Sequence, residues 1–402
     1  MRSTRALAVV SGAGALALAL LLTGCSTTGA GSATESKGAS QVKVTLTSDG
    51  GADACKLDAT TAAAGPVTFT VANESSTAIT EMEILSDQRI IGEKENLAPG
   101  LKASSFTLTL GGGTYQVYCP GAEKELQDFT VTGKAAASPT GSVTTVLKKG
   151  TDGYRVYVAG VLSDMTTAVG NLQTAVDAGD VPAAQKAYAL ARPFYEKVES
   201  DVDGFLLPGA DPTSNAGNLD YLVDMRESNL DPEVGWHGFH AIERDLWTTG
   251  ITDQTKQDAA ELVTNVGRLA DLAKDLTYKP EDLANGAAGL LDEVQANKIT
   301  GEEELYSHTD ISDFAANVEG AQQAFAYLQP GLKKIDAGLT KQVSAQFDKV
   351  NKALDAYRDP SVAGGYKIYT DELKASDAAK LSQIVQSLQT PLSKIAEKVA
   401  TA

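Results

Sequence analysis

The sequence is short of histidine, cysteine, aromatic residues and positive charge. Its 402 residues include three histidines and three cysteines, and 34 Lys and Arg stand against 52 Asp and Glu, for a formal net charge of -18. This balance argues against nucleic acid as a partner and suits a cation as ligand. Aromatic residues make up 6% of the chain, and no aromatic row is visible of the kind that would favour a cell-surface adhesin or polysaccharide-binding lipoprotein.

Only one long apolar run is present, and it lies at the N-terminus; no later segment approaches the ~20 apolar residues of a membrane-spanning helix. Two arginines precede the mostly apolar residues 6–22, and the sequence Leu-Thr-Gly-Cys then ends at Cys25. This order predicts a lipoprotein signal peptide over 1–24, with an acylated Cys25 that holds the exported protein on the outer face of the cell membrane. A soluble secreted protein is the alternative. Residues 25–40, rich in Ser, Thr, Gly and Ala, are expected to form a flexible tether.

The other two cysteines, Cys55 and Cys119, form a single possible pair. In an oxidising compartment such a pair more often forms a disulfide than two metal thiolates. Both interpretations stay open at this point.

Two segments differ in their hydrophobic period, which predicts a multidomain protein. Short runs of alternating apolar and polar residues, separated by Gly, Pro and Asn turns, fill residues 41–133 and predict a small antiparallel β-sandwich. Residues 134–150 lack such a period and are expected to be a linker. Apolar residues recur at helical spacing through 151–402, which predicts an all-α helical bundle.

Residues 236–247 carry the strongest chemical signal, because they contain two of the three histidines and both tryptophans. His240 and Glu243 are three residues apart, so a helix places both on one face. Glu196 and Glu199 have the same spacing, and two such pairs facing each other across a bundle would form a carboxylate-rich metal site. The alternatives are a His–Glu hydrogen bond that orders the helix and a solvated pair of glutamates.

Taken together, these features resemble the EfeO-like components of Efe iron-uptake systems, which join a cupredoxin-like domain to an imelysin-like domain of peptidase M75 type. The resemblance rests on residues 191–199, 219–227, 238–243 and 300–310 in the helical segment, and on residues 93–100 in the sheet segment. It implies a metal site in the helical domain formed by Glu196, Glu199, Asp220, His240, Glu243 and one acid of the run Glu302, Glu303 and Glu304, of which Glu303 is chosen, with Asp224 as a replacement for Asp220.

The predicted sheet domain departs from a blue-copper pattern. No histidine lies between residues 41 and 133, which excludes a copper centre of two His and one Cys. The weaker metal candidates in this domain are Glu81, Glu83, Glu93 and Glu95, with Cys55 and Cys119 as neighbours. Carboxylates suit hard ferric iron better than soft copper(I). The alternative is a sandwich with a disulfide and a solvated acidic edge.

The resemblance implies a membrane-anchored iron-binding protein that captures ferric or ferrous iron and delivers it to a permease, with a haem peroxidase as a further partner. Copper and zinc are alternative metals. Catalysis is not expected, because the His-Glu-x-x-His helix of zinc peptidases supplies two histidine ligands and a general base, and the His-x-x-Glu sequence here supplies one histidine. A metallopeptidase of M75 type is the enzyme alternative.

Overall fold

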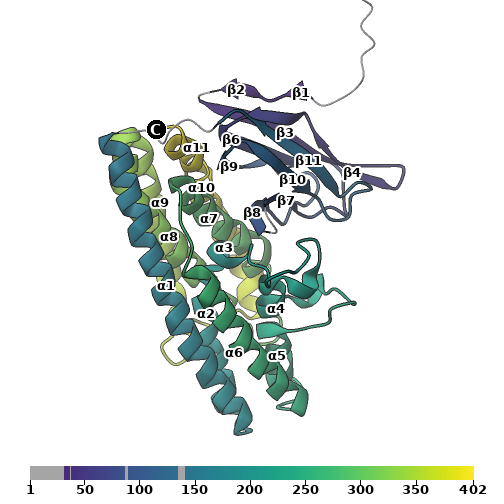
Figure 1. Ribbon diagram of the computed structural model, residues 1–402. Coiled ribbons are helices and arrows are strands. Elements are labelled where there is room, and N and C mark those ends of the chain that lie inside the picture. The colour runs from purple at the N-terminus through teal and green to yellow at the C-terminus, as the bar shows by residue number, and fades with distance from the viewer. Residues whose placement is uncertain (1–30, 37, 87–88, 135–140) are drawn as a thin grey trace, which may run out of the picture.

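A computed structural model describes residues 31–36, 38–86, 89–134 and 141–402, and it places a β-sandwich beside a helical bundle (Figure 1). The predicted order of a small β domain followed by an all-α domain is confirmed. Cys25 and the predicted signal peptide lie outside the described residues. Among the helices that the structure describes, none is both long and apolar enough to cross a membrane.

Two sheets form the sandwich, and their inner faces enclose the apolar core. One sheet has the order β1 (Gly31–Ser32), β5 (Ala59–Ala63), β11 (Leu126–Thr132), β10 (Gly113–Tyr118), β7 (Met82–Ser86) and β8 (Arg89–Lys94). The other has the order β2 (Thr34–Ser36), β3 (Ala39–Asp49), β6 (Gly65–Asn73) and β9 (Ser104–Leu110), with β4 (Ala52–Leu57) paired to β3. Phe69 lies at the centre of the core, with its ring 5.3 Å from those of Phe106 and Phe129.

The pairing within the sandwich is mixed, whereas the sequence predicts antiparallel pairing throughout. β3 pairs with β6 in parallel, and β5 pairs with β11 in parallel. The chain leaves β3 through β4 and β5 before it returns as β6, so β6 runs in the same direction as β3. The predicted tether of 25–40 contains strands β1 and β2 and the start of β3. The backbone of β1 pairs with β5 and that of β2 pairs with β3, so these residues belong to the sandwich. The sandwich therefore begins earlier than the period of the sequence indicates.

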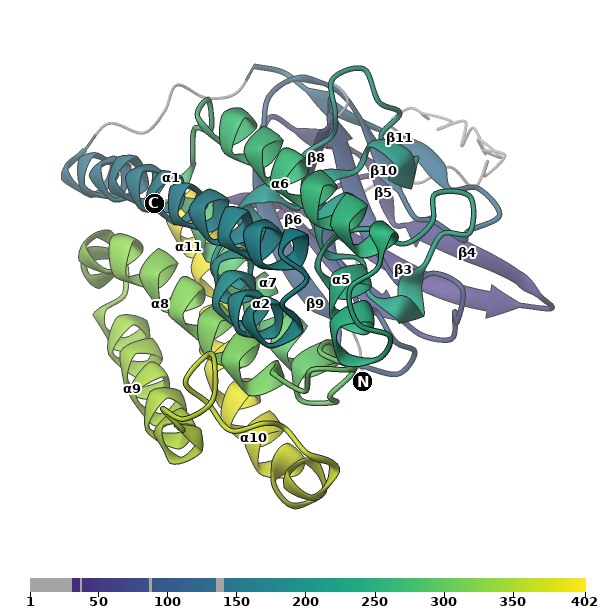
Figure 2. The same ribbon diagram turned by 90° about the horizontal axis from the view of Figure 1, so that it is seen from below.

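The helical domain is built around one large apolar core. Its α-helices are α1 (Ser142–Asp177), α2 (Val181–Glu196), α3 (Glu199–Val202), α4 (Leu219–Asp224), α5 (Gly238–Trp247), α6 (Asp253–Ala273), α7 (Pro280–Glu293), α8 (Asp310–Ile335), α9 (Ala337–Leu354), α10 (Asp371–Leu392) and α11 (Ile395–Ala400). Short turns of 3-10 helix cover η1 (Asn215–Gly217), η2 (Glu227–Asn229) and η4 (Asp355–Tyr357), and η3 (Val294–Lys298) is a π-helical turn that continues α7. Helix α9 lies on the side of the bundle away from the sandwich (Figures 1 and 2).

Helix α1 begins at Ser142, inside the segment 134–150 that the sequence predicts as linker. Val143 and Leu147 extend the apolar face of α1, and both contact the helical core. Together with Val146 they are the only Val, Leu or Ile residues of that segment, and three such residues within five positions give no clear period on their own. The linker is therefore shorter than predicted.

Strand β9 packs the sandwich against α7 and α11, and β8 lies beside the turn that follows α3 (Figure 1). The side chain of Asn285 donates to the carbonyl of Thr107 at 2.7 Å and accepts from its amide at 3.3 Å. Lys94 forms an ion pair with Asp292 at 2.8 Å. Gly204 permits the close approach, because a Cβ atom there would lie 2.4 Å from a backbone oxygen of β8. This contact sets Glu93 of β8, and Glu95 just after the strand, opposite acidic residues of the helical domain.

Candidate metal centre

Helix α5 carries the His240 and Glu243 pair on its buried face. The first residue of the helix, Gly238, must be a glycine for two reasons. Its φ of +78° is unfavourable for other residues, and a Cβ atom there would lie 2.1 Å from the carbonyl oxygen of Val223. Nδ1 of His240 lies 3.2 Å from Oε2 of Glu243. The other carboxylate oxygen, Oε1, accepts from the backbone amides of Tyr306 and Ser307 at 2.9 and 2.7 Å. The pair is therefore anchored to the loop 299–309.

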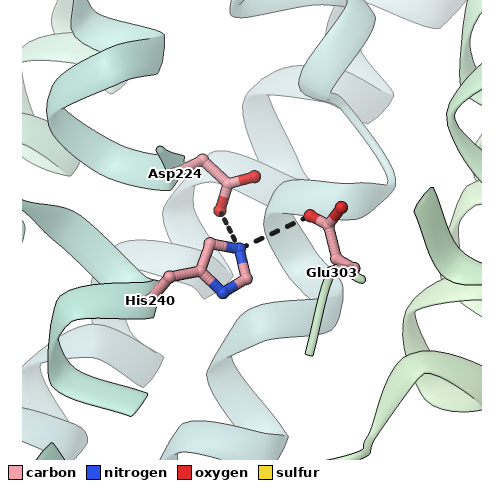
Figure 3. Close-up of side chains that lie close together, drawn as sticks. All are labelled: Asp224, His240 and Glu303. Carbon is pink, nitrogen blue, oxygen red and sulfur yellow. Dashed lines mark ion pairs between the residues drawn. The ribbon is translucent and has the colours of Figure 1, made fainter. Parts of the chain in front are cut away.

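Three further carboxylates surround the imidazole. Asp224 at the end of α4 and Glu303 in the loop 299–309 flank Nε2 of His240, at 3.7 and 3.4 Å (Figure 3). Glu304 Oε1 lies 3.9 Å from Nδ1. Ligand-type atoms of Asp224, His240 and Glu303, and those of His240, Glu243 and Glu304, lie within 4.8 Å of one another. We call the set Asp224, His240, Glu243, Glu303 and Glu304 the cage, and none of its residues is more than 7% exposed. One nitrogen and several carboxylate oxygens are donors suited to iron or zinc.

Two fully buried cations contact the same carboxylates. The guanidinium of Arg192 lies 2.5 Å from Glu196, 2.9 Å from Asp224, 2.7 Å from Glu303 and 3.1 Å from Glu304. The ammonium of Lys298 lies 3.0 Å from Glu196 and 3.1 Å from Glu303. The carboxylates of the metal-free cage are therefore partly neutralised by the protein itself.

The charges around the cage shift the protonation of its members. Burial by itself lowers the pKa of His240, but hydrogen bonds to Glu243 and Glu303 outweigh it and raise this pKa to about 10. Burial would raise the pKa of Glu303, yet Lys298, Arg226 and His240 hold it well below its usual range. These contacts favour a protonated imidazole and an ionised Glu303, so an ion that binds the nitrogen of His240 would displace its proton.

The structure separates the predicted pair Glu196 and Glu199. Helix α2 contains Pro193, ends at Glu196 and is followed by a turn, so that α3 begins at Glu199. Proline within a helix removes a backbone donor and favours its end or a kink. Glu196 consequently lies against Arg192 and Lys298 beside the cage, whereas Glu199 lines a different cavity.

Asp220 and Asp224 also occupy different places, although both lie on α4. Asp224 contacts His240 and Arg192 in the cage. Asp220 accepts a hydrogen bond from the hydroxyl of Tyr195 and lines the same cavity as Glu199. The structure thus places Asp224, the predicted replacement, in the cage and not Asp220.

This interdomain cavity has a volume of about 370 Å³ and lies between β8 and the helices α3 and α7. The acidic residues that line it from the sandwich are Glu93 and Glu95, and those from the helical domain are Glu199, Asp201, Asp203, Asp220, Asp282, Asp292 and Glu293. Glu83 pairs with Glu93 across β7 and β8, and Glu81 lies close enough to raise the pKa of Glu83, Glu93 and Glu95. Glu93 and Glu95 from the sheet domain therefore line one cavity with Glu199 and Asp220 from the helical domain, with Glu81 and Glu83 nearby.

The acidic groups of the interdomain cavity are short of counter-cations. Burial, followed by the charge of Asp220, raises the pKa of Asp203 to about 7. Burial and the neighbouring acids Glu293 and Glu81 raise the pKa of Glu95 well above its usual range. Carboxylates with raised pKa values bind a proton or a cation in place of the missing partner.

Cys55 and Cys119 form a disulfide, with their Cα atoms 6.3 Å apart. The bond crosses the sandwich core, and both residues are buried. The alternative that they bind metal as free thiolates is therefore wrong for this structure.

Sequence reasoning gave no role to Arg192, Lys298 or Asp313, whose carboxylate lies 3.6 Å from Arg192. Arg192 and Glu196 are four residues apart on one helix, and this spacing alone predicts the ion pair that they form. Nothing local indicates that Lys298 is buried, because the π-helical turn η3 and the loop after it set its position.

Comparisons with known proteins bear on the family of the chain. The imelysin family (peptidase M75) matches residues 150–397. Iron uptake system component EfeO of Escherichia coli strain K12 is 33% identical over 364 residues, which cover 90% of each chain, and EfeO of Shigella flexneri gives the same values. The chain belongs to the EfeO family. The imelysin match includes the whole cage, and the EfeO match extends over most of the sandwich as well as the bundle.

Solved structures similar to this EfeO-family chain include that of the copper protein rusticyanin. The matched parts of the two sequences are 18% identical. The match covers 25% of this chain and 82% of the rusticyanin chain, with a TM-score of 0.21. Reduced rusticyanin is 20% identical, covers 25% and 84%, and has a TM-score of 0.20.

Proposed function

We propose that this EfeO-family protein is the exported, membrane-anchored iron-binding component of an iron-uptake system. It captures iron and delivers it to a permease, with a haem peroxidase as a further partner. The observation that carries the proposal is the cage, in which His240 and Glu303 lie among further buried carboxylates. Relatives named as iron uptake components, similar over 90% of their length, support it. Iron, ferric or ferrous, is the cargo, with copper or zinc as alternatives.

The interdomain cavity is the proposed place of first capture. Its carboxylates are hard oxygen donors, and their raised pKa values favour a bound cation. Arg226 connects the cavity to the cage, because its guanidinium lies 3.0 Å from Glu293 in the cavity and 3.2 Å from Glu303 in the cage. An ion that neutralises Glu293 weakens the hold on Arg226, which gives the ion a short route from the cavity to the cage.

The burial of the cage argues against the metallopeptidase alternative. His240 and Glu243 are each 1% exposed, so a peptide bond cannot reach them, whereas a single ion can be enclosed. The adhesin alternative would need an exposed row of aromatic side chains, and none of the aromatic side chains in the described chain is exposed. Metal capture is the chemistry that these residues support best.

Equilibrium titration with iron, copper, zinc and manganese tests the proposal. His240→Ala and Glu243→Ala should each weaken iron binding strongly, and their effects should be non-additive because they share one ion. His237→Ala is the matched control, since His237 lies at the start of α5, outside the cage, and pairs with Glu261. Undiminished iron binding by the double variant would show that iron does not bind in the cage.

The cavity is tested by its effect on loading. Glu93→Gln together with Glu95→Gln should slow the uptake of iron into the cage without changing the final stoichiometry. Stopped-flow mixing with iron follows the rate, and the proposed route is excluded if the rate stays at the wild-type value.

A further inference from the structure

The oxygens that a metal ion would need are already occupied by the protein's own cations. Oε1 of Glu303 lies 2.7 Å from Nη2 of Arg192 and 3.1 Å from Nζ of Lys298. One oxygen of Glu196 faces Arg192 at 2.5 Å, and the other faces Lys298 at 3.0 Å. Each carboxylate thus bridges the two cations.

Arg192 also fills the space beside the imidazole. Its Nη2 lies 3.3 Å from Nε2 of His240, and its Nη1 lies 2.9 Å from Oδ1 of Asp224. The guanidinium carbon lies 5.5 Å from the centre of the Phe239 ring. Arg192 and Lys298 are both fully buried, so no bulk water can take over their contacts.

Metal binding and these contacts exclude each other. Zinc, one of the candidate ions, sits about 2.0–2.2 Å from carboxylate oxygen and imidazole nitrogen. An ion at that distance from Glu303 and His240 would occupy the position of the Arg192 guanidinium and repel both it and Lys298. Loading the cage therefore requires the two cations to move.

Two carboxylates of the interdomain cavity also act on the charge of Lys298. They are Glu199 and Glu293, and Oε2 of Glu199 is buried without a hydrogen-bond partner. The long, flexible stem of a lysine allows its ammonium to turn from one acidic group to another.

We propose that Arg192 and Lys298 are resident counter-cations of the metal-free cage, and that iron binds by cation exchange in which Lys298 turns from Glu196 and Glu303 to Glu199. This inference rests on the proposed function of the cage. Because the ion replaces two single positive charges, a divalent ion restores the charge balance of the cage, and a trivalent ion adds one positive charge.

Lys298→Met tests the exchange in the full-length protein. The variant lacks one competitor for Glu196 and Glu303, so it should bind ferric iron, supplied as the nitrilotriacetate complex at pH 8, roughly tenfold more tightly or better. The metal-free variant should melt at a lower temperature than wild type, and its melting temperature should rise more on adding iron. Lys197→Met is the matched control, because Lys197 pairs with Glu319 at the surface, and its affinity should equal that of wild type.

Glu199→Gln is a second variant that leaves the cage contacts intact and removes the proposed receiving carboxylate, and it should bind ferric iron more weakly than wild type. His240→Ala separates the two proposals. If His240→Ala loses iron while Lys298→Met binds it with unchanged or weaker affinity, iron binds in the cage but the exchange is wrong. If His240→Ala binds iron as wild type does, both proposals are overturned. If Lys298→Met does not fold, Lys298→Gln takes its place with the same expected outcome.

Discussion

Replacing Arg192 by methionine should destabilise the metal-free protein severely. The side chain contacts Glu196, Asp224, Glu303 and Glu304 at 3.1 Å or less, and methionine keeps the stem while removing the charge. Removing one partner of a buried ion pair costs about 3–5 kcal/mol. Lys298 and Arg226 still contact Glu196 and Glu303, but Asp224 and Glu304 keep only His240 as a nearby cation. We therefore expect a loss near the upper end, about 5 kcal/mol.

Thermal melting, followed by circular dichroism at pH 8 in metal-free buffer, measures this loss. One kcal/mol shifts the melting temperature by about 2–4 °C in a domain of this size, so the variant should melt roughly 10–20 °C below wild type. Exposed Arg155 on α1 provides the control Arg155→Met, which should stay within about 0.5 kcal/mol of wild type.

The same variant has a defined pH dependence. Without Arg192 the buried carboxylates have folded-state pKa values above those of the unfolded chain. The folded variant then binds more protons than the unfolded variant, and its stability rises as the pH falls. The gap to wild type should therefore narrow between pH 8 and pH 5. Equal melting of Arg192→Met and wild type at pH 8, or a gap that does not change with pH, would refute the reasoning.

Three further predictions concern other parts of the chain. Burial raises the pKa of Asp201 to about 7, although the hydrogen bond from Tyr154 opposes this rise; the stability that this group contributes therefore falls as the pH rises from about 4 to about 7. In urea unfolding, Asp201→Asn should lose less stability than wild type between pH 5 and pH 8, and an equal loss in the two proteins would contradict this. Cys55→Ser with Cys119→Ser opens a loop of sequence separation 64 and should lower the free energy of unfolding by about 4 kcal/mol; an unchanged urea midpoint would speak against the bond. Cys25→Ala should move the protein from the membrane fraction to the soluble fraction, and retention in the membrane fraction would exclude Cys25 as the anchor.

The sequence allowed the local geometry of the cage to be predicted where one helix determines it. His240 and Glu243 lie on α5, and their spacing alone places both on its buried face. The spacing of Glu196 and Glu199 predicts that these two side chains also share one face of a helix. This prediction is wrong, because they lie on different helices. Pro193 and the turn after Glu196 end α2, so the two glutamates face different sites.

Contacts between distant segments could not be predicted from local patterns. Glu303 and Glu304 enter the cage while Glu302 faces Ser228 outside it, and only the path of the loop 299–309 makes this choice. The burial of Lys298 likewise depends on the packing of η3 against α8. A lysine in a sequence normally indicates a solvated face, and nothing near Lys298 signals the exception.

Under the proposed function, the burial of the cage has a consequence for how fast a bound ion can leave. Every ligand group is at least nine-tenths buried, and the loop 299–309 is fastened to α5 through the two amides that Glu243 accepts. An ion inside cannot be reached by a chelator in solution until this loop opens, and loop openings of this kind take microseconds to seconds. The residence time of the ion then depends on the protein's motion as well as on the strength of the metal–ligand bonds. A receiving protein that pulls the loop away from Glu243 would shorten the residence time without competing for the metal.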